Sequence, residues 1–317
     1  MAVYSPISKE ELETFLNQYN IGSIIRYEGI LEGIENTNYK LETSENNYIL
    51  TIFEKRVNPA DIPFFINLKN HLAKKNFACP KPIKNNDGKY INLLNNKHCV
   101  IISFLKGKKT SKVENNHCKQ VGKMLGILHQ DSKDFLQKRN NTMNYNQWKN
   151  IFLKSQNAND SQFNDIMSNI NEELSYLETK WPRDLPEGII HADVFQDNVF
   201  FKNNKFSGLI DFYFACNDFF AYDIALTINA WCFDGKAKFK KDKFLNLIQG
   251  YESLRPLIEK EKIHFSTLLR GAALRILLTR IHDYIFHPDG AYVEPKDPKE
   301  YHSILQFHQE NNLGKLL

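Results

Sequence analysis

The sequence has little cysteine, and its cysteines form no pattern that could serve as a scaffold. Five cysteines stand far apart among 317 residues, and none of them belongs to a C-x-x-C pair. An odd number without close pairs argues against a disulfide framework and against a zinc site. The chain has no uninterrupted apolar run of the roughly 18 residues that a membrane helix needs, and its N-terminal segment soon becomes acidic, unlike a secretion signal. We therefore expect a cytoplasmic protein without a membrane partner.

The chain also lacks a strong excess of charge of one sign. Lys and Arg number 41 against 37 for Asp and Glu, which gives a formal net charge of +4. A nucleic-acid-binding protein normally has a marked basic excess, so no nucleic-acid partner is expected. With 42% hydrophobic and 25% charged residues, the composition is that of a folded globular protein. A single core stops growing at roughly 250–300 residues, so this length favours two lobes.

The first hundred residues are predicted to be rich in β-structure. Ser8 and Glu11 form a capping-box pattern that begins a short helix. Polar turns separate the apolar runs that follow, which predicts an antiparallel meander. The expected elements after the first helix are strands at 24–30, 38–43 and 48–53, a helix at 61–74 and a strand at 98–104. This part is predicted to be an N-terminal β-rich nucleotide-binding lobe, residues 1–104.

Beyond residue 104 the apolar residues recur mostly at helical spacing. The expected helices span 114–130, 145–156, 160–180, 219–232, 241–254, 262–286 and 297–311. One segment, 189–212, interrupts them with two short apolar runs around a Lys-Asn-Asn-Lys turn, which predicts a hairpin. The fold class is therefore predicted to be α+β, with a helical C-terminal lobe over 105–317.

The strongest functional pattern lies in this hairpin segment. His191, Asp193 and Asn198 stand in a His-x-Asp-x-x-x-x-Asn motif, and an apolar run ending in Asp211 follows. Phosphoryl transfer needs a carboxylate to take the proton of the attacking hydroxyl, and an amide oxygen with a second carboxylate to hold Mg²⁺. Each piece alone is common in turns. Their combination at this spacing, downstream of a β-rich lobe, predicts a phosphotransferase that uses ATP and Mg²⁺.

Several segments carry a resemblance to a known family. They are Gly33–Tyr39, Tyr48–Arg56, Pro63–Ile66, His191–Asn198, Asp211–Cys216, Tyr222–Ala225 and Asn229–Cys232. In these segments the chain resembles the aminoglycoside-phosphotransferase and choline-kinase branch of the protein-kinase-like fold, and within it the homoserine kinases. The resemblance spans nearly the whole chain. It implies a two-lobed protein-kinase-like fold and phosphorylation of a small-molecule hydroxyl, that of L-homoserine first, on the route to threonine.

The resemblance also implies roles for individual residues. Asp193 would be the catalytic base, and Asn198 and Asp211 would be the metal ligands. His191 would support the catalytic loop rather than carry a proton. Asp223 lies among apolar residues and needs hydrogen-bond partners there, so we favour a loop-bracing role for it over contact with the substrate.

The nucleotide side departs from the pattern of most relatives, in which a lysine on the third strand grips the phosphates. Thr51 stands at that position, and Phe64–Asn67 on the next helix offers no carboxylate. Lys55 or Arg56 could supply the charge, although an exposed strand end would look the same. The remaining expected nucleotide contacts, from the glycine-containing loop and from the strand between the lobes, are Gly33, Thr37, Asn38, Ser103 and Leu105.

The acceptor side is predicted from Arg275, a carboxylate and Trp231. A free amino acid needs a cation and an anion in its pocket, and Arg275 with Asp218 or Asp223 could fill these roles. Arg275 lies among apolar residues, where its guanidinium needs a carboxylate from the protein or a ligand. Trp231 could line the pocket or belong to the core.

Two alternatives remain open. An aminoglycoside, choline or methylthioribose could be the acceptor, although a polycationic aminoglycoside calls for a strongly acidic pocket lobe that this chain does not indicate. The missing strand lysine also fits a non-catalytic nucleotide-binding member of the fold. Such a protein would have little need for the complete set of base and metal ligands. Oligomeric state is not predicted.

Overall fold

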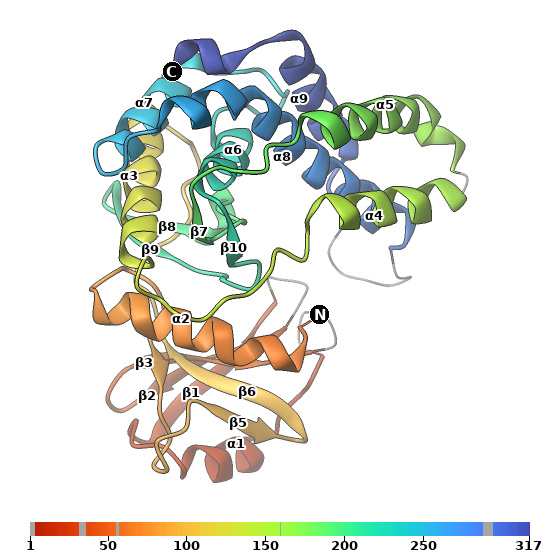
Figure 1. The fold of residues 1–317 in the computed structure, drawn as a ribbon. Coiled ribbons are helices and arrows are strands. Elements are labelled where there is room, and N and C mark those ends of the chain that lie inside the picture. Colours follow the sequence, from red (N-terminus) through yellow and green to blue (C-terminus); the bar gives the residue numbers. More distant parts are fainter. Residues whose placement is uncertain (1–3, 32–35, 55–56, 159, 288–293) are drawn as a thin grey trace. The chain divides into compact units, whose positions relative to one another are not determined.

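The computed structural model describes residues 4–31, 36–54, 57–158, 160–287 and 294–317 (Figure 1). The chain divides into two compact units. The N-terminal unit consists of residues up to 107 together with 207–213. Of the described residues, the C-terminal unit contains 108–206, 214–287 and 294–317. The β-rich start and the helical remainder agree with the predicted α+β class.

The N-terminal unit is built on one antiparallel sheet. Its strands are β1 (Ile24–Ile30), β2 (Thr37–Thr43), β3 (Asn47–Ile52), β4 (Pro82–Ile83), β5 (Ile91–Leu94) and β6 (Lys97–Ser103). The order is β1-β2-β3-β6-β4, and β5 also pairs with β6. Every strand predicted for this part is present within one residue of its expected bounds. The short β4 and β5 were not predicted, because two to four residues carry too little periodicity.

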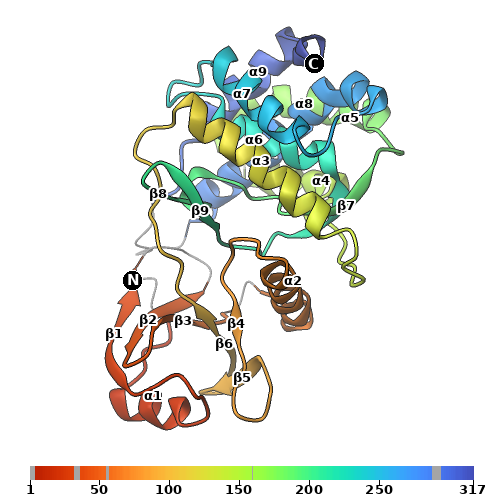
Figure 2. The ribbon, with the colours of Figure 1, turned by 90° about the vertical axis from the view of Figure 1, so that its left-hand side faces the viewer.

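Two helices accompany the sheet on different sides, α1 (Lys9–Leu16) and α2 (Ile62–Lys74) (Figure 2). The capping box predicted for α1 is present, since the Ser8 hydroxyl accepts the N–H of Glu11 and the Glu11 carboxylate accepts the N–H of Ser8. The apolar face of α1 packs on the sheet, and this packing forms the core of the unit. Burial of that face removes apolar area from water, which is the main source of stability for so short a helix.

The C-terminal unit is mainly helical. Its helices are α3 (Asn115–Asp131), α4 (Tyr145–Asn157), α5 (Asn164–Lys180), α6 (Phe220–Trp231), α7 (Lys241–Glu252), α8 (Glu259–Ile285) and α9 (Pro298–Glu310). Each corresponds to a predicted helix. The long α8 packs against α4, α5, α6 and α9. Within the described ranges, none of the helices combines the length and the apolar character that crossing a membrane requires.

Helices α3 and α7 cross closely through two glycines. A Cβ atom at Gly122 would lie 2.0 Å from the carbonyl oxygen of Leu247, and one at Gly250 would lie 2.0 Å from that of Lys119. No side chain fits at such a distance, so both positions require glycine. The close crossing holds α3, which carries His129, firmly within the unit.

Two small two-stranded sheets follow in the chain. The predicted hairpin exists as β8 (Val199–Lys202) and β9 (Lys205–Leu209), and β9 ends in residues 207–209 of the N-terminal unit. The two apolar runs around the Lys-Asn-Asn-Lys turn are these strands. Ile189 and Ile190, at the start of the predicted segment, belong instead to β7 (Glu187–Ile190), which pairs with β10 (Cys216–Phe219). The Asn-Asn turn of β8–β9 is visible in the sequence, whereas the β7–β10 pairing joins residues far apart in the chain. This pairing positions the loop that follows β7.

Candidate active site

The predicted catalytic motif lies in the loop between β7 and β8. His191 follows the last residue of β7, and a 3₁₀ turn at Gln196–Asn198 leads directly into β8. Ala192 has a backbone φ of 62°, which lies in the left-handed region that residues other than glycine rarely adopt. A conformation of this kind persists where the surrounding contacts enforce it. The contacts around Ala192 must therefore hold its backbone in this conformation.

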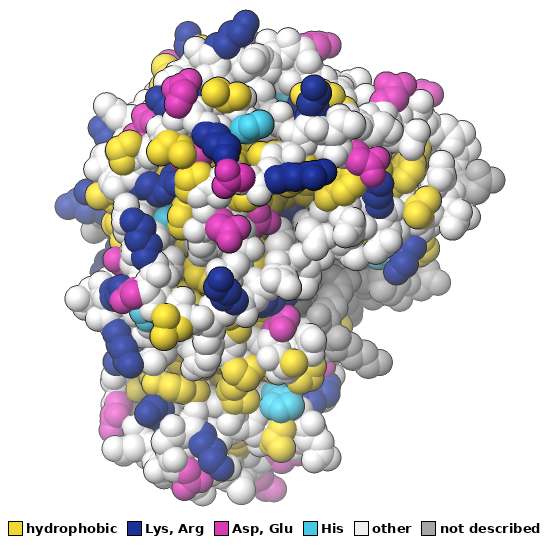
Figure 3. All heavy atoms as spheres, viewed as in Figure 1, with side chains coloured by type: hydrophobic (Ala, Val, Ile, Leu, Met, Phe, Trp, Pro, Cys, Tyr) yellow, Lys and Arg dark blue, Asp and Glu magenta, His cyan; other side chains and the backbone are white. Residues whose placement is uncertain are grey.

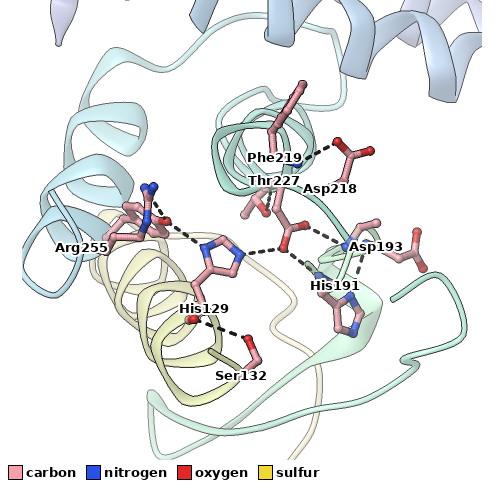
Figure 4. A network of polar contacts seen from close by, with 11 residues as sticks. His129, Ser132, His191, Asp193, Asp218, Phe219, Thr227 and Arg255 are labelled. Carbon is pink, nitrogen blue, oxygen red and sulfur yellow. Dashed lines mark hydrogen bonds and ion pairs between the residues drawn. The ribbon is translucent and has the colours of Figure 1, made fainter. Parts of the chain in front are cut away.

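Asp223 on α6 holds the backbone of this loop. Its carboxylate accepts the N–H groups of His191 and Ala192, each at 2.8 Å. The Nε2 of His129 lies 3.1 Å from the same carboxylate, and its Nδ1 lies 2.8 Å from the hydroxyl of Tyr251 (Figure 4). The imidazole of His191 accepts the N–H of Asp193 within the loop. Contacts of this kind would suit the support roles predicted for His191 and Asp223, which stay predictions.

The Asp223 carboxylate is completely buried, yet it is held in its ionised form. Burial opposes ionisation, but the hydrogen bond from His129 and the charges and N–H groups around it keep the pKa below its ordinary value. Burial lowers the pKa of His129, against the opposing effect of Asp223. The neutral imidazole therefore donates from Nε2 to Asp223, which leaves its Nδ1 to accept from Tyr251.

Asp193 presents its carboxylate away from this buried network (Figure 4). It is half-buried, so one part of it is available to a substrate. Asn198 donates from Nδ2 to the Asp193 carboxylate and to the Asp193 carbonyl oxygen, both at 2.9 Å. The amide NH₂ thus orients the expected base, and the amide oxygen of Asn198 remains for a metal. The structure brings these two predicted residues into direct contact.

Two further side chains hold the loop from behind. Trp231, completely buried, donates from its indole Nε1 to the carbonyl of Val194 at 2.7 Å. Arg275, 2% exposed, donates from Nη1 to the carbonyl of Ala192 at 2.8 Å. These contacts support the loop. A contact of either residue with the acceptor stays a prediction.

Asp218 on β10 lies within the same unit. Its carboxylate accepts from Nδ2 of Asn141 and from the N–H of Phe219, both at 2.7 Å. Burial raises the pKa of Asp218, while these hydrogen bonds and the charge of Arg275 act in the opposite direction. A carboxylate with two neutral donors and one nearby cation has capacity left for an ammonium group.

Asp211 belongs to the N-terminal unit and has a φ of 63°. Its Oδ1 is buried without a hydrogen-bond partner among the described residues. Burial raises the pKa of Asp211, and the N–H of Tyr213 and the ammonium of Lys69 oppose that rise. Burial lowers the pKa of Lys69 to about 8, against the effect of Cys79 and Asp211. Lys69 therefore stays mainly protonated at neutral pH.

The side-chain oxygen atoms of Asp211 and Asn198 are of the kind that binds Mg²⁺. Magnesium prefers carboxylate and amide oxygens, and it usually takes one or two protein ligands together with phosphate and water. The unpartnered Oδ1 of Asp211 is such an oxygen, and so is the amide oxygen of Asn198. Within the described ranges, no group of three or more His, Cys, Asp or Glu residues forms a protein-only cage. Each oxygen would suit a metal that arrives with nucleotide phosphates, and binding of one metal by both residues stays a prediction.

Two of the predicted nucleotide contacts interact with each other. Thr51 donates its hydroxyl to Oδ1 of Asn38 at 2.7 Å, across the β2–β3 pair. Thr37 donates to the carboxylate of Glu54 at 2.8 Å. Gly33 lies outside the described residues, as do Lys55 and Arg56. Their expected contacts stay predictions.

The strand β6 ends at Ser103, one residue before the end expected from the sequence. The hydroxyl of Ser103, the last residue of β6, accepts the N–H of Lys81 at 2.9 Å. The side chain of Leu105 packs against Gly208, where an added Cβ atom would lie 2.5 Å from Cδ1 of Leu105. Both residues are therefore part of the packing of the N-terminal unit. Adenine contacts at Ser103 and Leu105 stay predictions.

The sequence analysis missed two residues, His129 and Lys69. His129 occupies the apolar face of a predicted helix, where only its position on that face could have drawn attention to it. Lys69 follows Phe65 by four residues and precedes Leu72 by three. This spacing places a lysine on the buried face of α2, and it was the available signal.

The fold and the site define a class of protein. Residues 26–257 match the model of the phosphotransferase enzyme family, and the chain belongs to that family. The structure resembles a spectinomycin phosphotransferase in complex with ADP and spectinomycin, with a TM-score of 0.72, 16% identity and coverage of 96% of this chain and 95% of that one. It also resembles choline kinase from Cryptosporidium parvum, with a TM-score of 0.66, 17% identity and coverage of 96% and 95%. These likenesses show the shared protein-kinase-like fold.

More similar relatives narrow this class. The chain is 46% identical to homoserine kinase of Parvibaculum lavamentivorans over 98% of its own length and 96% of that protein. It is 46% identical to homoserine kinase of Sinorhizobium medicae, over 98% and 95%. The same identity holds for homoserine kinase of Agrobacterium fabrum, over 98% and 96%. The resemblance noted in the sequence is thus confirmed.

Proposed function

We propose that the protein transfers the γ-phosphoryl group of ATP to the side-chain hydroxyl of L-homoserine, giving O-phosphohomoserine on the route to threonine. The choice of homoserine as the acceptor is supported by the 46% identity to homoserine kinases over nearly the full length of both chains. The reaction type is supported independently by the loop that holds Asp193 and Asn198 in contact. Five free, buried cysteines suit a reducing cytoplasm, where we place the protein.

Asp193 is the proposed base. As the acceptor oxygen forms its bond to the γ-phosphorus and the bond to the leaving ADP oxygen breaks, the hydroxyl proton passes to the Asp193 carboxylate. The amide of Asn198 and the network around Asp223 keep that carboxylate in place, so little reorganisation is needed during the reaction.

Asn198 and Asp211 are the proposed Mg²⁺ ligands. Bound with the nucleotide, Mg²⁺ would neutralise the negative charge that gathers on the phosphates during transfer. The protein supplies oxygen ligands from two segments of the chain. The unpartnered Oδ1 of Asp211 supports this assignment.

The acceptor carries an α-ammonium and an α-carboxylate group. We assign Asp218 to the ammonium, because its carboxylate has neutral donors that leave capacity for a cation. Arg275 is the candidate partner for the acceptor carboxylate, because its Nε has no hydrogen-bond partner among the described residues. A substrate that lacks the ammonium or the carboxylate would leave a charged side chain of the pocket unpaired. This lowers kcat/KM far more than a change of one methylene does.

The alternative acceptors have less support. On the face shown in Figure 3, basic and acidic side chains are interspersed, whereas a polycationic aminoglycoside would favour a strongly acidic field. A non-catalytic nucleotide-binding protein would have no use for a carboxylate oriented as Asp193 is.

One experiment separates these readings. Phosphate transfer from ATP is measured with L-homoserine, L-serine, choline, methylthioribose and kanamycin as acceptors, and kcat/KM is compared. We expect homoserine to be phosphorylated well, serine poorly, and the acceptors without an α-amino acid group hardly at all. A higher kcat/KM for choline, methylthioribose or kanamycin would contradict homoserine as the acceptor. It would not contradict the assignment as a small-molecule kinase. ATP binding without transfer to any acceptor would favour the non-catalytic alternative.

A further inference from the structure

The strand β3 has no cation at the position where protein kinases grip nucleotide phosphates. In those kinases a lysine on the third strand contacts the phosphates and pairs with a glutamate on the following helix. Here Thr51 is buried, and its hydroxyl is committed to Asn38 on the neighbouring strand at 2.7 Å. The charge of the phosphates must therefore be balanced from another element.

The helix that follows this strand carries a lysine on its buried face. Lys69 of α2 is 3% exposed and shares that face with Phe65 and Leu72. Lysine is almost never fully buried unless it is paired, because desolvation of an ammonium is unfavourable. The position of Lys69 thus needs a negative partner.

Within the N-terminal unit, Asp211 is a carboxylate whose charge acts on Lys69. The charges of Lys69 and Asp211 act on each other, and Nζ of Lys69 lies 5.5 Å from the centroid of the Tyr213 ring, two residues after Asp211. The carbonyl of Lys69 accepts from the Sγ of Cys79 at 3.6 Å, which ties the backbone of α2 to the segment that follows it. The ring contact thus places the buried ammonium near the segment that carries Asp211, whose Oδ1 has no hydrogen-bond partner in the described part of the chain.

We propose that Lys69 is the fixed cation of the nucleotide site and supplies from α2 the positive charge that the strand lysine supplies in protein kinases. The inference rests on the proposed function, since it requires a nucleotide with its Mg²⁺ at Asp211. In this arrangement the helix carries the cation and the strand carries a neutral hydroxyl. Without nucleotide, Lys69 balances the charge of Asp211. With nucleotide, it also attracts the phosphates.

The first test compares the binding of MgATP and adenosine to the full-length protein and its variants by calorimetry. Lys69→Met keeps much of the length of the side chain and removes its charge, and Lys69→Arg keeps the charge. The matched control is Lys74→Met, which makes the same change at an exposed position of the same helix. We expect Lys69→Met to weaken MgATP binding by about 10- to 100-fold, the range for a lost charged hydrogen bond. Adenosine binding should stay unchanged, and Lys69→Arg and Lys74→Met should stay within a few-fold of wild type.

The second test needs no variant. An acyl-phosphate derivative of ATP transfers its acyl group to a lysine beside the bound phosphates, and mass spectrometry of the wild-type protein identifies the labelled residue. We expect label on Lys69 that excess MgATP prevents. ATP-competed label on Lys55 or another lysine, in place of Lys69, would overturn the inference even if Lys69→Met does not fold.

The outcomes separate the inference from the function on which it rests. Wild-type protein that binds no MgATP and phosphorylates no homoserine contradicts the proposed function itself. Wild-type protein that does both, with an unchanged ratio of MgATP to adenosine affinity in folded Lys69→Met, contradicts the role of Lys69 alone. In kinetics, Lys69→Met should raise the KM for ATP more than the KM for homoserine.

Discussion

The guanidinium of Arg275 donates a hydrogen bond to the carbonyl oxygen of Ala192, with an Nη1···O distance of 2.8 Å. Ala192 has a left-handed backbone and directly precedes Asp193. A side chain from α8 therefore helps to enforce the backbone conformation that presents the proposed base. Arg275 thus holds the loop, in addition to the role in binding the acceptor carboxylate that we propose for it.

Arg275→Met should lower kcat by about 10-fold or more, as expected when a charged hydrogen bond to a buried carbonyl is lost. MgATP affinity should stay unchanged. Steady-state kinetics with both substrates measures this, and a rise in the KM for homoserine alone would show that Arg275 also binds the acceptor carboxylate. Arg275→Lys, which keeps a donor, is the control. Wild-type kinetics in Arg275→Met would contradict both roles.

Asp193→Asn removes the proposed base and keeps its shape. Turnover should fall by about 10²–10⁴-fold, the usual range for lost general-base catalysis, with MgATP affinity retained. The control is Asp197→Asn, an exposed carboxylate of the same loop that pairs with Lys109 and Lys296. Turnover of Asp193→Asn within a few-fold of wild type would remove the base assignment.

Asp211→Asn and Asn198→Ala should raise the Mg²⁺ concentration required for half-maximal activity, because each removes a proposed oxygen ligand. A crystal structure with Mg²⁺ and a non-hydrolysable ATP analogue provides the direct measurement. Oxygens of Asp211 and Asn198 should lie about 2.0–2.1 Å from a metal. Metal ligands from other residues would contradict the assignment.

Asp223→Asn should destabilise the folded protein by at least about 1–3 kcal/mol, because the buried N–H groups of His191, Ala192 and His129 lose their charged acceptor. Its NH₂ group would also face the N–H donors of His191 and Ala192. Chemical denaturation measures this change. The control is Asp184→Asn, an exposed carboxylate paired with Lys260, which should change stability by less than about 0.5 kcal/mol.

The acid stability of the protein should depend on Asp223 as well. Its pKa in the folded state lies below the ordinary value of 3.8, so the unfolded chain takes up the proton first as the pH falls. The stabilisation is fully present above about pH 4 and is lost as the pH falls through the lower folded-state pKa. Wild type should therefore lose more stability than Asp223→Asn between about pH 4 and pH 2. Equal losses would contradict the ionised state of Asp223.

Local signals in the sequence determined most of the fold. The helices of the C-terminal unit, the β1–β2–β3 meander and the capping box at Ser8 each depend on periodicity or side-chain chemistry within a few residues, and all are present in the structure. The His-x-Asp-x-x-x-x-Asn motif belongs to the same class. Its two polar residues are five apart, and a single turn brings Asn198 onto Asp193.

Tertiary structure alone decided the contacts between distant segments. The pairing of β7 with β10, the hydrogen bond between His129 and Asp223, and the contact of the Lys69 ammonium with the Tyr213 ring join residues separated by tens of positions or more. Nothing in a local pattern specifies such partners, because burial and charge select them only after the elements have packed. A buried lysine and a buried histidine look like ordinary helix residues in the sequence. Their roles arise from the carboxylates that the fold brings to them.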